Sequence, residues 1–280
     1  MGRPADTVTC VRSLQQIDDW PVPHAAAAVV TADGIQHAHG DTDRVFPLAS
    51  VTKLLTAQAV LLAVEEGVLD LDDSAGPPGS TVRHLLAHAS GLAFNDDQIQ
   101  AKPGTRRIYS NTGYAVLGDV VARRSGFAFA DYLAEAVTQP LGLARTVLAG
   151  PAGHGGRSTV TDMATFARQL LAPTLLARQT YDEAITVAFP GLSGVLPGYG
   201  VQRPNDWGLG PEIRGAKHPH WTGASNSPRT VGHFGQSGTF CWADPDAGVA
   251  LVVLTDRDFG DWCMPRWPAL ADAVLGEFAD

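Results

Sequence analysis

Residues 54–64 are apolar around nearly the whole circumference of a helix rather than along one face. The stretch contains neither glycine nor proline, so we expect a helix that begins near Ser50 and ends at Gly67. A helix that is apolar on all sides is buried on all sides. The sequence therefore predicts a core helix that other elements surround.

Strand patterns lie toward the two ends of the chain. Residues 25–31 and 35–39 flank an Asp33-Gly34 pair, which predicts an antiparallel hairpin. Residues 234–243 and 248–255 are strand-like and flank a turn at 244–247, which predicts a second hairpin. Residues 265–278 then repeat apolar side chains at helical spacing, which predicts an amphipathic helix lying on a sheet.

The middle of the chain is helical in pattern. We expect helices over residues 82–88, 112–124, 129–137 and 159–171, separated by glycine and proline breaks. Strands at the ends and helices between them predict an α/β (α+β) sandwich, an antiparallel sheet flanked by helices with a helical insertion. We place the discontinuous sheet domain at residues 1–75 and 155–280, and the inserted domain at residues 76–154.

The composition disfavours nucleic-acid-binding, membrane-spanning and disulfide-rich proteins. The 280 residues include 20 basic and 29 acidic side chains, a net charge of −9, which disfavours nucleic acid as a partner. No apolar run is long enough to span a membrane. The three cysteines are too few and too widely spaced for a disulfide framework, and no signal peptide is visible, so we expect a cytoplasmic protein with reduced thiols.

The strongest local feature is Ser50-Val51-Thr52-Lys53 at the start of the buried helix. Side chains at positions i and i+3 share one helix face, so Ser50 and Lys53 lie together. Burial lowers the proton affinity of a lysine, which could then accept the serine proton. The alternative is a serine that caps the helix and a lysine that extends to water.

Two further segments contain polar side chains beside glycine or a helix start. Tyr109 and Asn111 precede the helix at Thr112. The Tyr109 phenol could exchange a proton with a substrate if the cation of Lys53 were close. The Asn111 amide could bind a carbonyl group of the substrate. The alternative is a packed tyrosine and a helix cap. His233 to Gly238 open a predicted strand, where the backbone N–H of Gln236 could join that of Ser50 as an oxyanion donor.

Five segments together resemble the serine β-lactamase and penicillin-binding-protein superfamily, in its class C β-lactamase, D-alanyl-D-alanine carboxypeptidase and esterase branch. They are residues 46–53, 84–92, 103–114, 140–143 and 232–235, and the resemblance covers roughly residues 25–260. It implies that Ser50 is the acylated nucleophile, Lys53 its proton partner, Tyr109 the residue that shuttles the proton to the leaving group, and Asn111 the holder of the acyl side chain.

His233 and Gly235 occupy the third motif, where many relatives have Lys-Thr-Gly. A histidine is mostly neutral at pH 7, so it is a weaker anchor for a substrate carboxylate than a lysine. This departure favours a neutral ester over a penicillin or a D-alanyl peptide. Whether Lys53 or Tyr109 is the acylation base stays open.

We therefore predict a serine hydrolase that acts on a small ester through an acyl-enzyme, without a cofactor or metal. The catalytic alternatives are a β-lactamase and a D-alanyl-D-alanine carboxypeptidase or D-amino-acid amidase. An alternative of another class is a non-catalytic module that binds or senses an acyl compound. His84 and His88, four residues apart on a helix, are weak metal candidates, and Trp207 and Trp242 could line an acyl pocket or fill the core.

Overall fold

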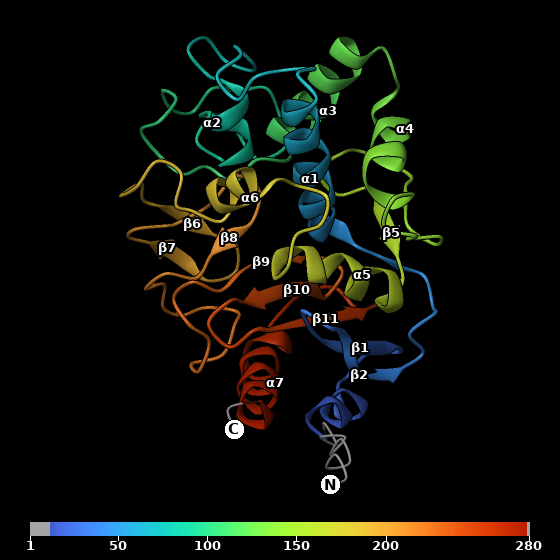
Figure 1. The fold of residues 1–280 in the computed structure, drawn as a ribbon. Helices are drawn as coiled ribbons and strands as arrows, with labels where there is room; N and C mark the ends of the chain where they lie inside the picture. The colour runs from blue at the N-terminus through green and yellow to red at the C-terminus, as the bar shows by residue number, and fades with distance from the viewer. Residues whose placement is uncertain (1–11, 279–280) are drawn as a thin grey trace, which may run out of the picture.

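The centre of the molecule is a six-stranded antiparallel sheet, in the order β2-β1-β11-β10-β9-β8 (Figure 1). The computed structural model describes residues 12–278. The strands are β1 (Ala25–Thr31), β2 (Gly34–Gly40), β8 (Glu212–Ile213), β9 (Val231–Gly235), β10 (Thr239–Asp244) and β11 (Val249–Thr255). The first and last thirds of the chain thus meet at the β1–β11 pair, where Ala28 lies opposite Val252.

The inner strands are buried on both faces, because alternate side chains enter two different cores. In β1, Ala26, Ala28 and Val30 face one core, whereas Ala27 and Val29 face the other. This explains why β1, β10 and β11 are almost continuously apolar in sequence. The sheet therefore requires a helical layer on each side.

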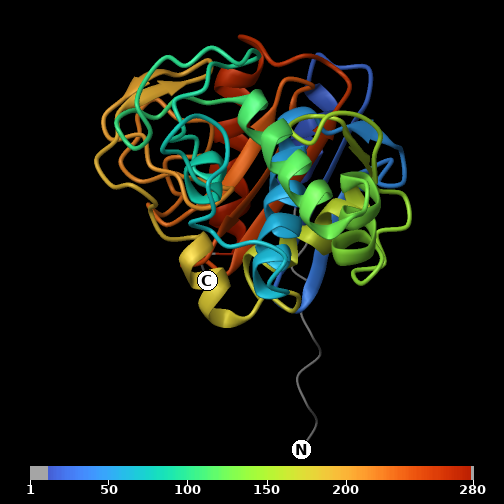
Figure 2. The same ribbon diagram turned by 90° about the horizontal axis from the view of Figure 1, so that it is seen from above.

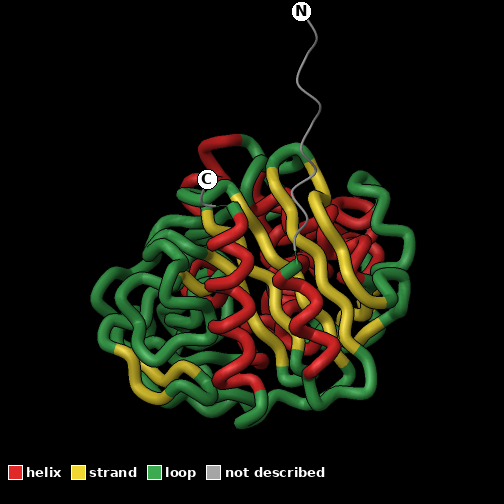
Figure 3. The backbone as a smooth tube through the Cα atoms, turned by 90° about the horizontal axis from the view of Figure 1, so that it is seen from below, coloured by secondary structure: helices red, strands yellow, loops and turns green. Residues whose placement is uncertain are grey.

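One layer consists of the two ends of the described chain. Helix α7 (Cys263–Glu277) and the short helix η1 (Ser13–Asp19) lie side by side across one face of the sheet (Figure 3). Trp267, Leu270 and Val274 of α7 are fully buried there, as the helical spacing predicted. Glu277 accepts hydrogen bonds from the backbone N–H and the hydroxyl of Ser13, which joins the two helices.

The opposite layer contains α1 (Thr52–Glu65) and α5 (Val160–Ala167), with α2 (Val82–Leu86), α3 (Asn111–Ser125) and α4 (Phe129–Leu133) beyond them (Figures 1 and 2). The π-helical turn η3 (Ala134–Thr138) continues α4, and η4 (Arg168–Leu170) continues α5. Residues 52–63 of α1 are all buried, so the core helix predicted from its all-round apolar pattern is confirmed.

The predicted class, an antiparallel sheet flanked by helices, is confirmed, and so are both hairpins. The prediction of one continuous strand over residues 234–243 was wrong. A turn at Gln236–Gly238 separates β9 from β10. Three further elements were not predicted: helix α6 (Arg178–Ala184), the hairpin β6 (Gly194–Leu196)–β7 (Gly200–Gln202), and the small sheet β3 (Phe46–Pro47)–β5 (Gly156–Ser158)–β4 (Val147–Leu148). The division into domains at 75/76 and 154/155 stays a prediction.

No helix among residues 12–278 is long and apolar enough to cross a membrane. Cys241 and Cys263 are buried free thiols, and burial raises the pKa of each to about 12. Cys10 lies outside the described residues.

Candidate active site

Ser50 lies in the short helical turn η2 (Ala49–Val51) that leads into α1. The preceding residue, Ala49, has a φ of 45°, a left-handed conformation that costs an L-residue roughly 1–2 kcal/mol. Strained backbone of this kind clusters at active sites, where the surrounding structure holds it in place. The turn leaves the Ser50 side chain partly exposed, at a small pocket of about 70 Å³.

Lys53 lies one turn further along and is fully buried. Its Nζ is 3.2 Å from Ser50 Oγ, 2.6 Å from Asn111 Oδ1 and 2.8 Å from the carbonyl oxygen of Gly153. Burial lowers the pKa of this amine well below its usual value. The predicted juxtaposition of Ser50 and Lys53 is confirmed, and this lysine does not extend to water.

These contacts orient the lysine for proton transfer. The Gly153 carbonyl has no proton to give, and Lys53 also donates to the Asn111 side-chain oxygen. A neutral amine that uses both of its N–H groups there directs its lone pair at the third neighbour, Ser50 Oγ. The Lys53 amine is therefore oriented to accept a proton from Ser50.

Asn111 is the first residue of α3 and joins two parts of the site. Its Oδ1 accepts from Lys53, and its Nδ2 donates to Asn95 Oδ1 at 2.8 Å. Ser110 caps α3, with its hydroxyl accepting from the Gly113 N–H at 3.0 Å. The alternative interpretation of Asn111 as a helix cap is therefore wrong, since Ser110 is the cap and the Asn111 amide contacts Lys53 instead.

Tyr109 lies above the Lys53 amine, whose Nζ is 4.7 Å from the centre of the phenol ring. Burial raises the pKa of Tyr109, and the neighbouring Ser50 hydroxyl offsets that rise only in part. The phenol therefore keeps its proton at neutral pH and is suited to donate it. The Lys53 amine therefore lies over the face of the Tyr109 ring, and proton exchange between the two side chains stays a prediction.

His233 lies on β9 with its ring facing Tyr109. Its Nδ1 is 2.7 Å from the Phe234 carbonyl, which can only accept, so the proton is on Nδ1 and Nε2 is the acceptor. Nε2 lies 3.5 Å from the Tyr109 hydroxyl. Burial and the nearby Lys53 lower the pKa of His233 to about 3, so the imidazole is neutral. It accepts a hydrogen bond in this position and carries no charge.

Gly235 and the turn after it hold β9 against the Ser50 turn. A Cβ on Gly235 would lie 2.5 Å from the Leu48 carbonyl oxygen, so only glycine permits this approach. Ser237 Oγ donates to the Pro47 carbonyl at 2.7 Å, and Thr239 Oγ1 donates to the Leu48 carbonyl at 2.9 Å. Gly235 therefore acts through packing rather than as a direct ligand.

Gln236, in the same turn, is exposed and lines the pocket with Ser50. The N–H of Ser50 lies in the first turn of a helix, where it has no intrahelical acceptor. Ser50 and Gln236 thus line the same pocket, and the oxyanion hole predicted for their two N–H groups stays a prediction. Trp207 also lines this pocket, whereas Trp242 is buried in the core on the opposite face of the sheet.

His88 and Arg107 support the site, although the sequence suggested only a weak metal-binding role for His88 and none for Arg107. His88 has a φ of 54°, its Nδ1 accepts the Ser110 N–H at 3.2 Å, and its ring centre lies 4.5 Å from that of Tyr109, with the two rings tilted by 46°. Arg107, beside Tyr109 in the chain, is 2% exposed and donates to the carbonyls of Ala188 and Asn205 at 2.7 and 3.0 Å. A fully buried arginine so near a candidate tyrosine is a signal that only the folded chain reveals.

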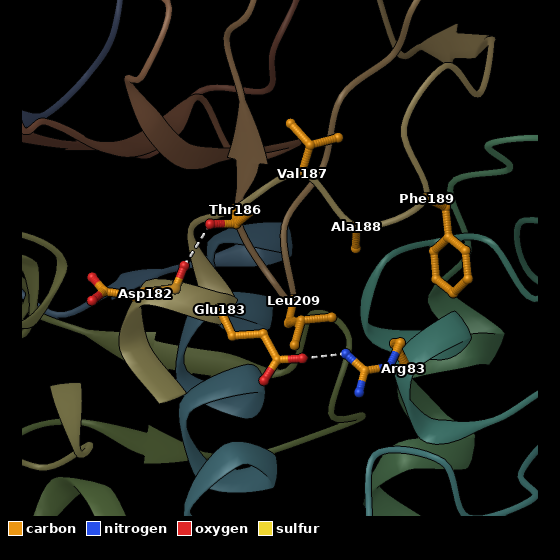
Figure 4. Close-up of a pocket in the computed structure, with 8 residues that line it drawn as sticks. All are labelled: Arg83, Asp182, Glu183, Thr186, Val187, Ala188, Phe189 and Leu209. Atoms are coloured by element: carbon orange, nitrogen blue, oxygen red, sulfur yellow. Dashed lines mark hydrogen bonds and ion pairs between the residues drawn. The ribbon is translucent and has the colours of Figure 1, made fainter. Parts of the chain in front are cut away.

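A larger cavity of about 430 Å³ lies elsewhere, between α2 and α6 (Figure 4). An ion pair between Arg83 and Glu183 crosses it, and Thr186 Oγ1 donates to the Asp182 carbonyl at 2.7 Å. It contains no nucleophile beside a base. Nearby His84 bonds to Thr81 Oγ1 and stacks on Phe189, and residues 12–278 contain no cluster of three or more metal-ligating side chains.

A family model described as Beta-lactamase matches residues 19–275. The chain belongs to the β-lactamase family. Its fold is that of a solved chain described as a β-lactamase (Mb2281c) from Mycobacterium bovis, with a TM-score of 0.94 and 62% identity over 95% of this chain and 99% of that one.

Two more distant proteins are also similar to this chain, one in sequence and one in fold. Penicillin-binding protein 4* of Bacillus subtilis is 31% identical over 138 residues, which are 38% of this chain and 31% of that relative. The match thus spans about a third of the length of that curated protein. EstCE1, described as a hydrolase with promiscuous acyltransferase activity, shares the fold with a TM-score of 0.78 at 19% identity, over 96% of this chain and 97% of that one.

Proposed function

We propose that this β-lactamase-family hydrolase cleaves small neutral carboxylic esters through an acyl-enzyme on Ser50. The observation that carries the proposal is the contact of a buried, pKa-lowered Lys53 with Ser50 Oγ at 3.2 Å, in a pocket whose third-motif residue is a neutral histidine. The contact between Lys53 and Ser50 supports nucleophilic catalysis. The neutral His233 supports a substrate that has no carboxylate beside the reacting carbonyl.

In the acylation step, neutral Lys53 takes the Ser50 proton while Oγ attacks the ester carbonyl. The N–H groups of Ser50 and Gln236 stabilise the oxyanion. Tyr109 gives its proton to the leaving alcohol oxygen and recovers one from the Lys53 ammonium. Water then attacks the acyl-enzyme with the same groups in reversed roles, releasing the acid and restoring Ser50. We assign Lys53 as base because burial lowers its pKa and raises that of Tyr109.

A second candidate is hydrolysis of a lactam or a D-alanyl peptide. It is favoured by the 62% identity to a chain described as a β-lactamase. Against it, His233 offers no charge to bind the carboxylate of such a substrate. Asn111 and Gln236, which we propose to contact substrate in either case, do not distinguish the two.

The test is steady-state release of p-nitrophenol from p-nitrophenyl butyrate by the full chain and by Ser50→Ala. Sustained release that disappears in the variant supports the esterase, and benzylpenicillin then serves as competitor. Equal release by both proteins contradicts the role of Ser50. A single stoichiometric burst would identify an acyl-binding sensor instead, and turnover of benzylpenicillin but not of the ester would identify a lactamase.

A further inference from the structure

A groove of about 370 Å³ adjoins the pocket that contains Ser50, and its lining includes Phe94, Arg106, Ile108, Tyr109, Val195 and Pro197. We call it the Arg106 groove. Three of these residues, Phe94, Tyr109 and Pro197, also line the pocket that contains Ser50. The two hollows therefore adjoin each other, so the groove lies next to a ligand bound at Ser50.

The two walls of the groove are held together by the backbone. The Arg107 N–H donates to the Ser193 carbonyl at 3.0 Å, and Arg107 bridges to Gly194 at the start of β6. A Cβ on Gly194 would lie 2.0 Å from the Arg107 carbonyl oxygen, so the contact depends on glycine. Because the Arg107 guanidinium is buried among carbonyls on the other side, the groove is formed before any ligand arrives.

The lining is mostly apolar, with the polar Gln100 and two arginines, of which Arg107 has its guanidinium bonded to backbone carbonyls. Phe94 and Val195 are 49% and 53% exposed, which is unusual for large apolar side chains that lie together. Arg106 is exposed and forms no ion pair with any acidic side chain among residues 12–278. The groove thus presents apolar surface and an unpaired positive charge to a ligand.

Tyr109 determines which part of the substrate enters the groove. Its phenol protonates the leaving oxygen, so the alcohol portion of the ester lies on the Tyr109 side of the reacting carbonyl. We propose that the Arg106 groove binds the alcohol portion of the substrate, with an apolar body on Phe94, Val195 and Pro197 and an anionic end at Arg106. This inference rests on the esterase function proposed above and specifies its substrate class.

The charge test compares two butyrate esters of similar length, one of 1-hexanol and one of 6-hydroxyhexanoic acid, by following acid release in a pH-stat. The expected result is that Arg106→Gln lowers the ratio of kcat/KM for the anionic ester to that for the hexyl ester by about three- to ten-fold. The matched control is Arg123→Gln, which makes the same charge change roughly 18 Å along α3 from Asn111. It leaves the ratio unchanged.

The apolar test uses Phe94→Ala, with Phe127→Ala as the control because Phe127 is equally exposed, at 51%, just beyond α3. Phe94→Ala is expected to lower the preference for hexyl over methyl butyrate by about three- to ten-fold, the value of one or two buried methylene groups. It leaves the preference for butyryl over acetyl p-nitrophenyl esters as it is, because the acyl group lies elsewhere.

Three results would overturn the inference. If Arg106→Gln leaves the kcat/KM ratio of the anionic to the hexyl ester unchanged, Arg106 does not bind the anionic end. If Phe94→Ala leaves the preference for hexyl over methyl butyrate unchanged, Phe94 does not bind the apolar body. A shift in acyl rather than alcohol preference would assign the groove to the acyl chain. In each of these results Ser50-dependent turnover persists, whereas a failure of the esterase proposal abolishes Ser50-dependent turnover of every ester.

Discussion

At the scale of single residues, the chemistry depends on one buried amine. Lys53 has no carboxylate partner among the contacts of its Nζ; its hydrogen-bond partners are a hydroxyl, an amide oxygen and a carbonyl. Without a countercharge, desolvation is the dominant influence on its pKa, which is lowered. A lysine in this setting loses its proton more readily than an exposed lysine, which supports the proposed role as a base.

Replacing Lys53 with methionine keeps the length of the side chain and removes the base. We expect Lys53→Met to lower kcat/KM for p-nitrophenyl butyrate by about 10²–10⁴-fold, the usual contribution of a positioned general base. The control is Lys102→Met, an exposed lysine, which keeps full activity. Activity of Lys53→Met close to that of the parent chain would show that Tyr109 or water is the base.

The pH profile is a second prediction at this scale. Because the neutral form of Lys53 is the active one, kcat/KM rises with pH, with its midpoint well below 10.5. His233, with a pKa of about 3, contributes no limb between pH 5 and 9. Initial rates over that range check both statements, and a bell centred on pH 6.5 would contradict them.

At the scale of elements, the site exists because β9 packs directly on the turn that carries Ser50. Gly235, Ser237 and Thr239 all contact the carbonyls of residues 47–48. These contacts hold the turn that contains Gln236 against the turn that contains Ser50, as the proposed pair of oxyanion donors requires.

A methyl group at position 235 tests this packing. Gly235→Ala would place Cβ 2.5 Å from the Leu48 carbonyl oxygen, so β9 must move away from Ser50. We expect a loss of about 1–3 kcal/mol in the free energy of unfolding by urea, and a larger proportional loss of kcat. Gly276→Ala in α7, where the added carbon meets nothing within 4 Å, is neutral or stabilising. Equal behaviour of the two variants would contradict the packing argument.

Elements with a strong local pattern were predictable, and those fixed by distant contacts were not. The hairpin at Asp33-Gly34 and helices α1 and α7 follow from turn chemistry and apolar spacing alone. The break between β9 and β10 was missed because its apolar flanks hide a three-residue turn whose bonds go to Pro47 and Leu48, far away in sequence. The hairpin β6–β7 is too short for any periodicity to show.

The same distinction applies to the site. The Ser50–Lys53 pair was predictable because it lies within one helical turn. The contact of Asn111 with Lys53 joins residues 58 positions apart, and the role of His88 appears only when its ring meets Tyr109. The catalytic roles of Ser50, Lys53 and Tyr109, and substrate contact by Asn111, His233, Gly235 and Gln236, stay predictions; for Gly235 the geometry favours packing instead.

At the scale of the whole molecule, the buried histidines couple the site to stability. His88 and His233 are neutral in the folded state, since burial lowers both pKa values below 6.5. The unfolded chain therefore binds more protons than the folded chain as the pH falls below 6.5, so the stability that these histidines contribute is present above that pH and is lost below it.

We expect the free energy of unfolding to fall between pH 6.5 and 5 by roughly 1 kcal/mol per pH unit for each of these two histidines. Urea titrations at closely spaced pH values measure the slope. His233→Asn is expected to reduce that slope by roughly 1 kcal/mol per pH unit, the contribution of one histidine. The control His37→Asn, at a partly exposed position on β2, is expected to leave the slope unchanged. A stability that does not vary over this range would show that neither buried histidine changes its pKa on folding.

The central claim is that Ser50 forms a covalent acyl-enzyme, and the most direct measurement is peptide mass spectrometry after rapid acid quench of the full chain mixed with p-nitrophenyl butyrate. We predict one added butyryl group, located on the peptide that contains Ser50 and absent in Ser50→Ala. A label on any other residue, or rapid turnover of the ester with Ser50 unmodified at every quench time, would contradict the account.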